Sequence, residues 1–197
     1  MSQEIVFESF QSIARLSRDV VVTEKIDGTN AQVFIADDGT IMAGSRNRWL
    51  GLDKTEDAFG FGRWVKEHEE ELRTMGPGRH FGEWWGAGIQ RKYNTGEKRF
   101  SLFNVGRWSD NPEERGIDQA TGQPRAARPA CCFLVPVLYR GPFDTAKIDA
   151  VMNDLEETGS IAAPGFMRPE GIVVWHEHAR TLFKKTIGDD GHKGARG

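Results

Sequence analysis

The sequence predicts an α+β fold built mainly from antiparallel sheet. Short stretches rich in β-branched and aromatic residues recur along the chain, whereas only two stretches have helical spacing. The turn Asp37-Asp38-Gly39, between two of the strand-like stretches, is typical of a β-hairpin. Many strands in sequence with few helices favour the α+β class.

The expected strands share an enrichment in Val, Ile, Thr, Phe, Tyr and Trp, the residues that fit a pleated, half-buried surface. They comprise residues 20–23, 32–36, 40–44, 80–84, 100–105, 131–138, 171–175 and 180–184. The first of them leads directly into Glu24 and Lys25, so a lysine is expected at the end of a buried strand.

Two helices are expected, over residues 53–75 and 144–158. In the first, side chains recur at three- and four-residue spacing: Phe61, Trp64, Val65, His68 and Leu72. In the second, Asp144 is a candidate cap, and one face carries Ile148, Val151, Met152 and Leu155. Residues 109–129 are polar and rich in Pro, Gly and Arg, which predicts a mobile insertion, and residues 188–197 are expected to form a flexible tail.

Length and composition are those of one soluble globular domain spanning residues 1–197. The chain has 197 residues, 38% of them hydrophobic, and its 26 basic and 29 acidic residues give a formal net charge of −3. It has no apolar run of the roughly 18 residues that a membrane helix needs, and its first residues lack a signal-peptide pattern. The only cysteines, Cys131 and Cys132, are adjacent, which suits neither a disulfide nor a metal site. We therefore expect a cytoplasmic protein that does not enter membranes.

The most informative stretch is TEKIDGTN, residues 23–30. A lysine at the end of a strand, before a tight glycine turn, is held so that only its tip meets a pocket. A lysine can be a covalent nucleophile only when it is neutral, and at an ordinary pKa roughly one in 2,500 is neutral at pH 7. Burial, neighbouring cations or a metal must therefore assist it. Taken alone, this stretch is more often a surface lysine beside an ordinary turn.

Further short motifs follow in a fixed order. They are Gly44-Ser45-Arg46, Phe81-Gly82-Glu83, Leu102-Phe103-Asn104, residues 169–173 (PEGIV) and Phe183-Lys184-Lys185. Together with residues 23–30, this order resembles the covalent nucleotidyltransferase superfamily of polynucleotide ligases and mRNA capping enzymes, and most of all the nick-sealing RNA ligase family of bacteriophages. The resemblance spans residues 23–185, nearly the whole chain.

The resemblance implies a nucleotidyltransferase (ATP-grasp-like) domain of mainly antiparallel sheets with flanking helices, and an ATP-dependent RNA ligase. Lys25 would attack the α-phosphorus of ATP, expel pyrophosphate and become lysyl-N-AMP. AMP would then pass to a 5′-phosphate end, and a 3′-hydroxyl would displace it. The expected partner is RNA, nicked or with 5′-phosphate and 3′-hydroxyl ends, or an RNA–DNA hybrid, and we expect a monomer.

The family's site residues carry over one by one. Glu170 is a hard oxygen ligand suited to Mg²⁺ or Mn²⁺. Nucleotide contacts are implied for Glu24 at the adenine edge, Ile26, Asn30 near the phosphates, Arg46 as a phosphate fork, Glu83 at the ribose hydroxyls, Phe103 as an adenine-stacking face, and Lys184 and Lys185 at the α-phosphate. Without the motif order, Phe103 would instead be core packing and Arg46 a solvated strand end.

Two features depart from the family pattern. The last motif commonly reads Lys-x-Lys, but here Lys184 and Lys185 are adjacent, and adjacent strand residues point to opposite faces. We expect Lys184 to reach the phosphate and keep Lys185 in reserve. Many relatives also have an additional carboxy-terminal domain, which we do not expect here as a separate OB domain.

Residues 86–108 combine five bases with one acid, and Tyr93, Phe100 and Trp108 are interleaved with them. Such a mixture suits phosphate contact and base stacking, which predicts part of a nucleic-acid interface, although a charge run is more commonly a solvated loop. The alternatives to an RNA ligase are an ATP-dependent DNA ligase, or a non-catalytic nucleotide- or nucleic-acid-binding module of the same fold.

Overall fold

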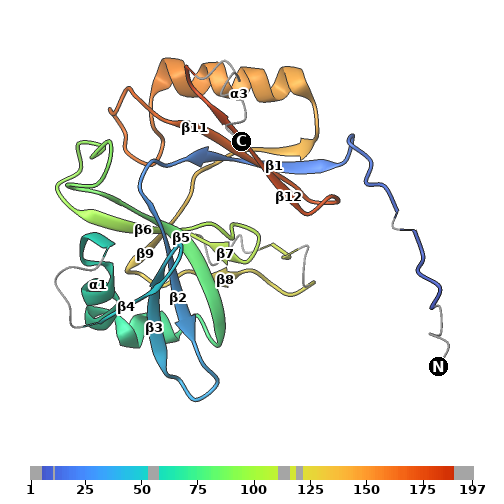
Figure 1. Ribbon diagram of the computed structural model, residues 1–197. Coiled ribbons are helices and arrows are strands. Elements are labelled where there is room, and N and C mark those ends of the chain that lie inside the picture. The colour runs from blue at the N-terminus through green and yellow to red at the C-terminus, as the bar shows by residue number, and fades with distance from the viewer. Residues whose placement is uncertain (1–5, 11, 53–57, 111–115, 119–121, 189–197) are drawn as a thin grey trace, which may run out of the picture.

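The computed structural model describes residues 6–10, 12–52, 58–110, 116–118 and 122–188. Within these ranges the chain forms two main β-sheets with helices on their outer faces, and the segment that precedes the first strand extends away from the body (Figure 1). The α+β class with mainly antiparallel sheet is confirmed, and no separate OB domain is seen within the described ranges.

The first sheet has four antiparallel strands in the order β10-β1-β11-β12. Their bounds are β1 (Asp19–Lys25), β10 (Val137–Pro142), β11 (Gly171–His176) and β12 (Thr181–Thr186). Helix α3 (Thr145–Thr158) covers the outer face of this sheet (Figure 1). Asp144 caps the helix as expected, because its Oδ1 accepts hydrogen bonds from the backbone N–H groups of Ala146 and Lys147.

The second sheet has six strands in the order β4-β3-β2-β5-β6-β9. They are β2 (Thr29–Ile35), β3 (Ile41–Ser45), β4 (Trp49–Leu50), β5 (Gly78–Gly86), β6 (Lys98–Leu102) and β9 (Cys132–Leu134), and only β9 pairs in parallel. One face of this sheet packs against η1 (Ala58–Gly60), α1 (Phe61–Glu67) and α2 (Glu69–Arg73). Strand β7 (Trp108–Ser109) pairs with β8 (Ala126–Ala127) as a small separate sheet.

Two element predictions need correction. Residues 131–138 form two strands, β9 and β10, in different sheets, because the chain crosses between the sheets at Pro136, whose carbonyl accepts from the backbone N–H of Glu24. The helix expected over 53–75 is instead a set of short helices in its described part, since Gly60 has a left-handed φ of 86° and His68 a non-helical φ of −116°. Residues 53–57, 111–115, 119–121 and 189–197, on which parts of the expected helix, insertion and tail fall, lie outside the described ranges.

Three apolar clusters hold this arrangement together. One lies between the six-stranded sheet and α1 and α2, and one between the four-stranded sheet and α3. The third lies between the two sheets and includes Val21, Ile26, Trp85, Tyr93 and Phe166. The candidate site lies beside this third cluster, where the chain passes from β1 to β2. No helix in the described ranges is both long and apolar enough to span a membrane.

Candidate active site

Lys25, the last residue of β1, lies beside Glu170, the residue before β11. Lys25 pairs with Gly171 in the antiparallel register of the two strands, so Glu170 is next to it across the sheet. The Nζ atom of Lys25 lies 2.5 Å from Oε2 of Glu170, and both side chains retain some solvent exposure. This Oε2 makes no other regular hydrogen bond within the described residues, so the ion pair with Lys25 is its one polar contact there.

The turn between β1 and β2 requires a glycine. A Cβ added to Gly28 would lie 2.5 Å from the backbone oxygen of Trp84 and 2.7 Å from Cβ of Trp85. The close approach lets the backbone N–H of Gly28 donate to Oε1 of Glu83 at 3.0 Å. The glycine of the motif therefore brings the end of β1 against β5.

Glu83 is a buried carboxylate in the middle of β5, with 8% of its surface exposed. Besides Gly28, it accepts a hydrogen bond from Nδ2 of Asn30 to its Oε2 at 3.0 Å. Desolvation by burial raises the pKa of Glu83 to about 7, although the Gly28 hydrogen bond and the charge of Lys25 oppose the rise. The structure thus joins Lys25, Asn30, Glu83 and Glu170 in one cluster.

The carboxylate of Glu24 points to the opposite face of β1 from Lys25 and is 1% exposed. It accepts hydrogen bonds from Oγ of Ser160 at 2.5 Å and from the backbone N–H groups of Ile161 and Ala162 at 2.9 Å each. Burial raises the pKa of Glu24 despite these three donors. In this conformation the carboxylate is not available for the expected contact with an adenine edge.

Sequence reasoning missed two side chains that hold the turn after Lys25. The hydroxyl of Tyr93 accepts from the backbone N–H of Asp27 at 2.7 Å. The Arg91 guanidinium donates to Oδ2 of Asp27 at 2.9 Å and to the backbone oxygens of Arg168 and Pro169 at 2.9 and 3.3 Å. Arg91 therefore links the turn after Lys25 to the segment that leads into Glu170. Local sequence gives no signal for a contact over more than sixty residues.

The strand register separates the two adjacent lysines of β12. Lys184 pairs with Val173, which pairs with Thr23, so Lys184 lies on the face of the sheet that also carries Lys25. Lys185 lies on the other face, toward α3, and its Nζ is 2.5 Å from Oδ1 of Asp149. Of the two, Lys184 is the one that shares the Lys25 face.

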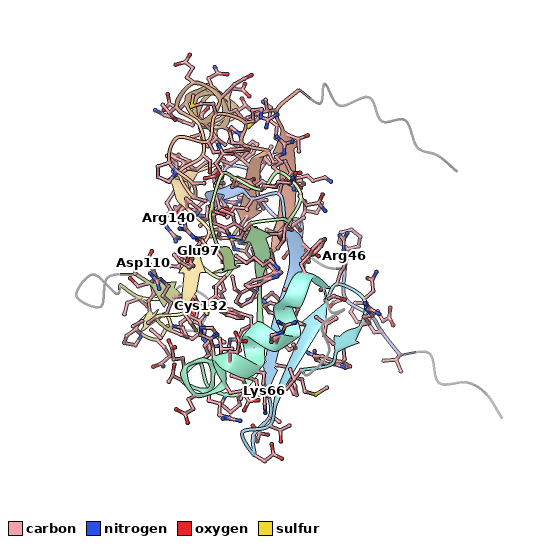
Figure 2. The ribbon with its side chains drawn as sticks, turned by 90° about the vertical axis from the view of Figure 1, so that its left-hand side faces the viewer. Arg46, Lys66, Glu97, Asp110, Cys132 and Arg140 are labelled. Carbon is pink, nitrogen blue, oxygen red and sulfur yellow. The ribbon has the colours of Figure 1, made fainter. Side chains whose placement is uncertain are left out.

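The remaining expected contacts lie around the same junction. Ile26 is buried in the cluster between the sheets. Phe103 follows β6 and is 40% exposed, so its ring is partly open to a ligand. Arg46, in the turn between β3 and β4, is exposed, and Figure 2 shows its side chain on the opposite side of the molecule from Cys132 and Arg140.

The aromatic part of the interface predicted over residues 86–108 is wrong. Tyr93, Phe100 and Trp108 are all buried, in the clusters on either face of the six-stranded sheet, and so cannot stack on bases. Two bases of this stretch are also engaged within the protein: Arg99 pairs with Glu97, and Lys98 donates to the backbone oxygen of Phe59. In this structure these three rings therefore belong to the protein's interior.

A divalent metal fits this site only if a bound nucleotide supplies phosphate oxygens in addition to the protein's own donors. The described residues contain no group of three His, Cys, Asp or Glu side chains that could hold a metal ion. Glu170 offers an oxygen that, among the described residues, has a polar contact only with Lys25. Mg²⁺ and similar ions are commonly bound by one or two carboxylates together with substrate phosphates and water, and this donor set fits that pattern.

Solved structures of RNA ligases have the same fold as this chain. A Naegleria gruberi RNA ligase variant without ligand matches with a TM-score of 0.58 and 21% identity, over 86% of this chain and 50% of that one. Variants of that ligase with ATP and Mn, and with AMP and Mn, match with TM-scores of 0.57 and 0.58, each at 21% identity. These two matches cover 88% and 87% of this chain and 51% and 50% of theirs. The chain thus spans about half the length of those ligases.

A family model described as RNA ligase matches residues 18–186. Since the match covers most of the sequence, the chain belongs to the RNA ligase family. A search of curated proteins found no match.

Proposed function

We propose that this protein is an ATP-dependent RNA ligase that joins 5′-phosphate and 3′-hydroxyl ends through a lysyl-AMP at Lys25. The observation that carries the proposal is the Lys25–Glu170 pair at the junction of the two sheets, in a chain of the RNA ligase family. The Naegleria gruberi ligase structures with ATP or AMP and Mn, which share the fold, support the choice of nucleotide and metal.

In the observed ion pair, Lys25 is an ammonium and has no lone pair with which to attack. Transfer requires that the ammonium give up a proton to water and move away from Glu170. The neutral nitrogen then forms a bond to the α-phosphorus of ATP, the bond to the bridging oxygen breaks, and pyrophosphate leaves. The position of Lys25 at the end of a paired strand fixes its backbone, so that only the side chain moves.

Charged groups from both sheets would neutralise the phosphates during this step. Arg46 would supply a planar fork to phosphate oxygens, and Lys184 a point charge on the same sheet face as Lys25. Asn30, held by Glu83, would lie near the phosphates, and the Glu83 carboxylate would accept from the ribose hydroxyls.

The base would lie against an apolar surface. Phe103 would stack on adenine through its exposed ring, and Ile26 would line the pocket. The adenine contact of Glu24 and the phosphate contact of Lys185 stay predictions, each with a side chain that in this structure binds another part of the protein.

Glu170 would hold Mg²⁺ or Mn²⁺ together with phosphate oxygens and water, and a bound divalent ion would supply positive charge that offsets the charge developing on the phosphates. The chain's own residues then have to position the nucleotide, which Lys184, Arg46 and Phe103 do in this proposal.

The acceptor would be RNA, as a nick in a duplex, an RNA–DNA hybrid or separate ends, in the cytoplasm of a bacterial or phage-infected cell. The RNA ligase family match supports RNA over DNA. AMP would pass from Lys25 to the 5′-phosphate, and the 3′-hydroxyl would then displace it. We expect the ligase to act as a monomer.

Covalent labelling tests the proposal. The purified protein is incubated with α-labelled ATP and Mg²⁺ or Mn²⁺, denatured, and examined for label that survives, beside Lys25→Ala and the matched control Lys147→Ala on the exposed side of α3. We expect label in the wild type and in Lys147→Ala and none in Lys25→Ala. A folded wild type that takes no label from ATP would contradict the proposal, and label from GTP instead would indicate capping chemistry.

A further inference from the structure

The six-stranded sheet has an open face that continues away from the candidate active site. Along β2 the residues Ala31, Val33 and Ile35 face the core, so Asn30, Gln32 and Phe34 lie on the other face. The register with β5 places Glu83, Phe81 and Arg79 beside these three in turn. Successive rows on one face lie about 7 Å apart, so the rows of Phe81 and Arg79 follow directly from the row of Glu83.

Aromatic rings are exposed on this face. Phe81 is 51% exposed. Trp49, which lies in β4 and pairs with Gly44 of β3, is 43% exposed. The rings of Phe34 and Trp49 lie 6.0 Å apart. The backbone N–H of Phe103 donates to the carbonyl of Phe81, so the face adjoins the proposed adenine-stacking ring.

Arg79 lies over two of these rings. Its guanidinium lies 4.9 Å from the ring centre of Phe34 and 5.2 Å from that of Trp49. Its Nη1 donates to Oε1 of Gln32 at 2.9 Å. The side chain of Gln32 lies over Gly44, where an added Cβ would be only 2.8 Å from Cγ of Gln32, so the glycine makes room for this arrangement.

The charge of the face is suited to a polyanion. Among the described residues of the two rows that contain Phe81 and Arg79, none is acidic. Two further bases, Arg46 and Arg48, lie in the turn that directly precedes Trp49. The nearest acids along these strands are Glu83 in the candidate active site and Asp37 in the turn beyond β2. Exposed rings with guanidinium groups bind unpaired bases and phosphates of single strands, whereas the bases of a duplex are not open to a flat ring.

We propose that the aromatic–arginine face, formed by Phe34, Trp49, Arg79 and Phe81, binds unpaired nucleotides of the substrate next to the end that reacts. The proposal rests on the proposed RNA ligase function and adds a substrate preference: ends with single-stranded nucleotides bind better than a fully paired nick. The rings would stack on bases, and Arg79 would contact phosphate or stack on a base.

Binding of a fluorescent, 5′-phosphorylated single-stranded oligoribonucleotide tests the face. We expect Phe81→Ala and Trp49→Ala each to weaken the affinity about tenfold, whereas Trp49→Phe, which keeps a ring, stays within about twofold of the wild type. Phe183→Ala is the matched control, because Phe183 is 54% exposed but lies on the α3 side of the other sheet. It should bind like the wild type. Arg79→Ala should lower the salt dependence of binding, by about one released ion, and Arg63→Ala on α1 should not.

Covalent labelling with ATP, measured on the same variants, separates this proposal from the function on which it rests. Wild-type amounts of label in the Phe81, Trp49 and Arg79 variants, with weakened RNA binding, support a distinct RNA surface. If the wild type takes no label but its RNA binding depends on these side chains, the ligase proposal is wrong and the RNA-binding role of the face is supported. The proposed RNA-binding role of the face is contradicted if RNA binding is unchanged in Phe81→Ala and Trp49→Ala, or if Phe183→Ala loses as much. It is also contradicted if label is lost together with binding, or if a paired nick binds with equal affinity.

Discussion

Glu83 combines burial, two internal hydrogen bonds and a neighbouring lysine, and these influences act in opposite directions on its charge. Gly28 and Asn30 donate to the two carboxylate oxygens, which favours the ionised form, as does Lys25. Burial outweighs them, and the pKa is raised to about 7. Ionisation of Glu83 is therefore less favourable in the folded protein than in the unfolded chain, and it lowers the free energy of unfolding.

Glu83→Gln tests this cost through the pH dependence of stability. Between pH 4.5 and about 7 the unfolded chain loses the Glu83 proton while the folded chain keeps it, so the folded state binds more protons and stability falls as pH rises. The fall is at most about 1.4 kcal/mol per pH unit, and it is absent in the glutamine variant. Urea unfolding of both proteins at pH 4.5 and 8 should show wild type losing stability relative to Glu83→Gln. If the difference in unfolding free energy between wild type and Glu83→Gln does not change with pH, the pKa of Glu83 is the same in the folded and unfolded chain. The control is Glu67→Gln at an exposed position, which should keep the pH dependence of the wild type.

Lys184 and Lys185 have different surroundings although they are neighbours in sequence. Lys184 lies on the Lys25 face, and Lys185 pairs with the exposed carboxylate of Asp149 on α3. We expect Lys184→Ala to slow lysyl-AMP formation by at least about tenfold, because a positive charge near the phosphates is lost. Lys185→Ala should stay within about twofold, since exposed ion pairs contribute little. Equal small losses in initial labelling rates would contradict the assignment of Lys184 to the phosphate.

At the scale of the element, strand alternation gives β1 two separate tasks. Glu24 and Lys25 are adjacent, but one is buried with its carboxylate bound to the segment 160–162, and the other is partly exposed at the junction of the sheets. The segment after Ser160 leads toward Glu170, so Glu24 holds the approach to the residue that Lys25 contacts.

Alanine at these two positions should therefore give opposite results. Glu24→Ala leaves the N–H groups of Ile161 and Ala162 without their acceptor and should cost about 2–4 kcal/mol of unfolding free energy. Lys25→Ala leaves the buried Oε2 of Glu170 without its ion-pair partner and should cost less, about 1–2 kcal/mol, while abolishing covalent labelling. Urea unfolding beside the labelling assay measures both. A Glu24→Ala protein as stable as the wild type would show that its carboxylate does not secure this segment.

Local sequence predicted the elements better than it predicted what they contact. Strand composition found β1, β2, β3, β5, β11 and β12, and the Asp144 cap found the start of α3, because these signals lie within a few residues of one another. The motif order found Lys25, Glu83 and Glu170, which the structure brings together. It could not find Arg91 or Tyr93, whose contacts with Asp27 depend on how two sheets meet. Nor could local sequence tell that Tyr93, in the loop between β5 and β6, is buried whereas Phe81 on β5 is exposed.

Over the whole molecule, the candidate site is assembled from two sheets at the point where the chain passes from β1 to β2. Lys25 and Glu170 come from the four-stranded sheet, and Glu83 and Asn30 from the six-stranded sheet. Apolar packing of Trp85, Tyr93 and Phe166 holds the sheets together but has little directional preference. Directional contacts are therefore needed to align the candidate catalytic groups across the junction.

Arg91 is such a contact, because it comes from the loop between β5 and β6 and holds both Asp27 and the backbone before Glu170. We expect Arg91→Ala to lower stability by only about 1 kcal/mol, since the Asp27 pair is partly exposed, but to slow lysyl-AMP formation about tenfold through misalignment of Lys25 and Glu170. The loss should appear in kcat with little change in the KM for ATP, because Arg91 is not among the proposed nucleotide contacts. Arg91→Lys should not restore the rate, since a single ammonium cannot reproduce the planar fork, whereas Arg63→Ala should be silent. Single-turnover labelling over a range of ATP concentrations would decide the matter, and a raised KM at unchanged kcat would mean that Arg91 acts on nucleotide binding instead.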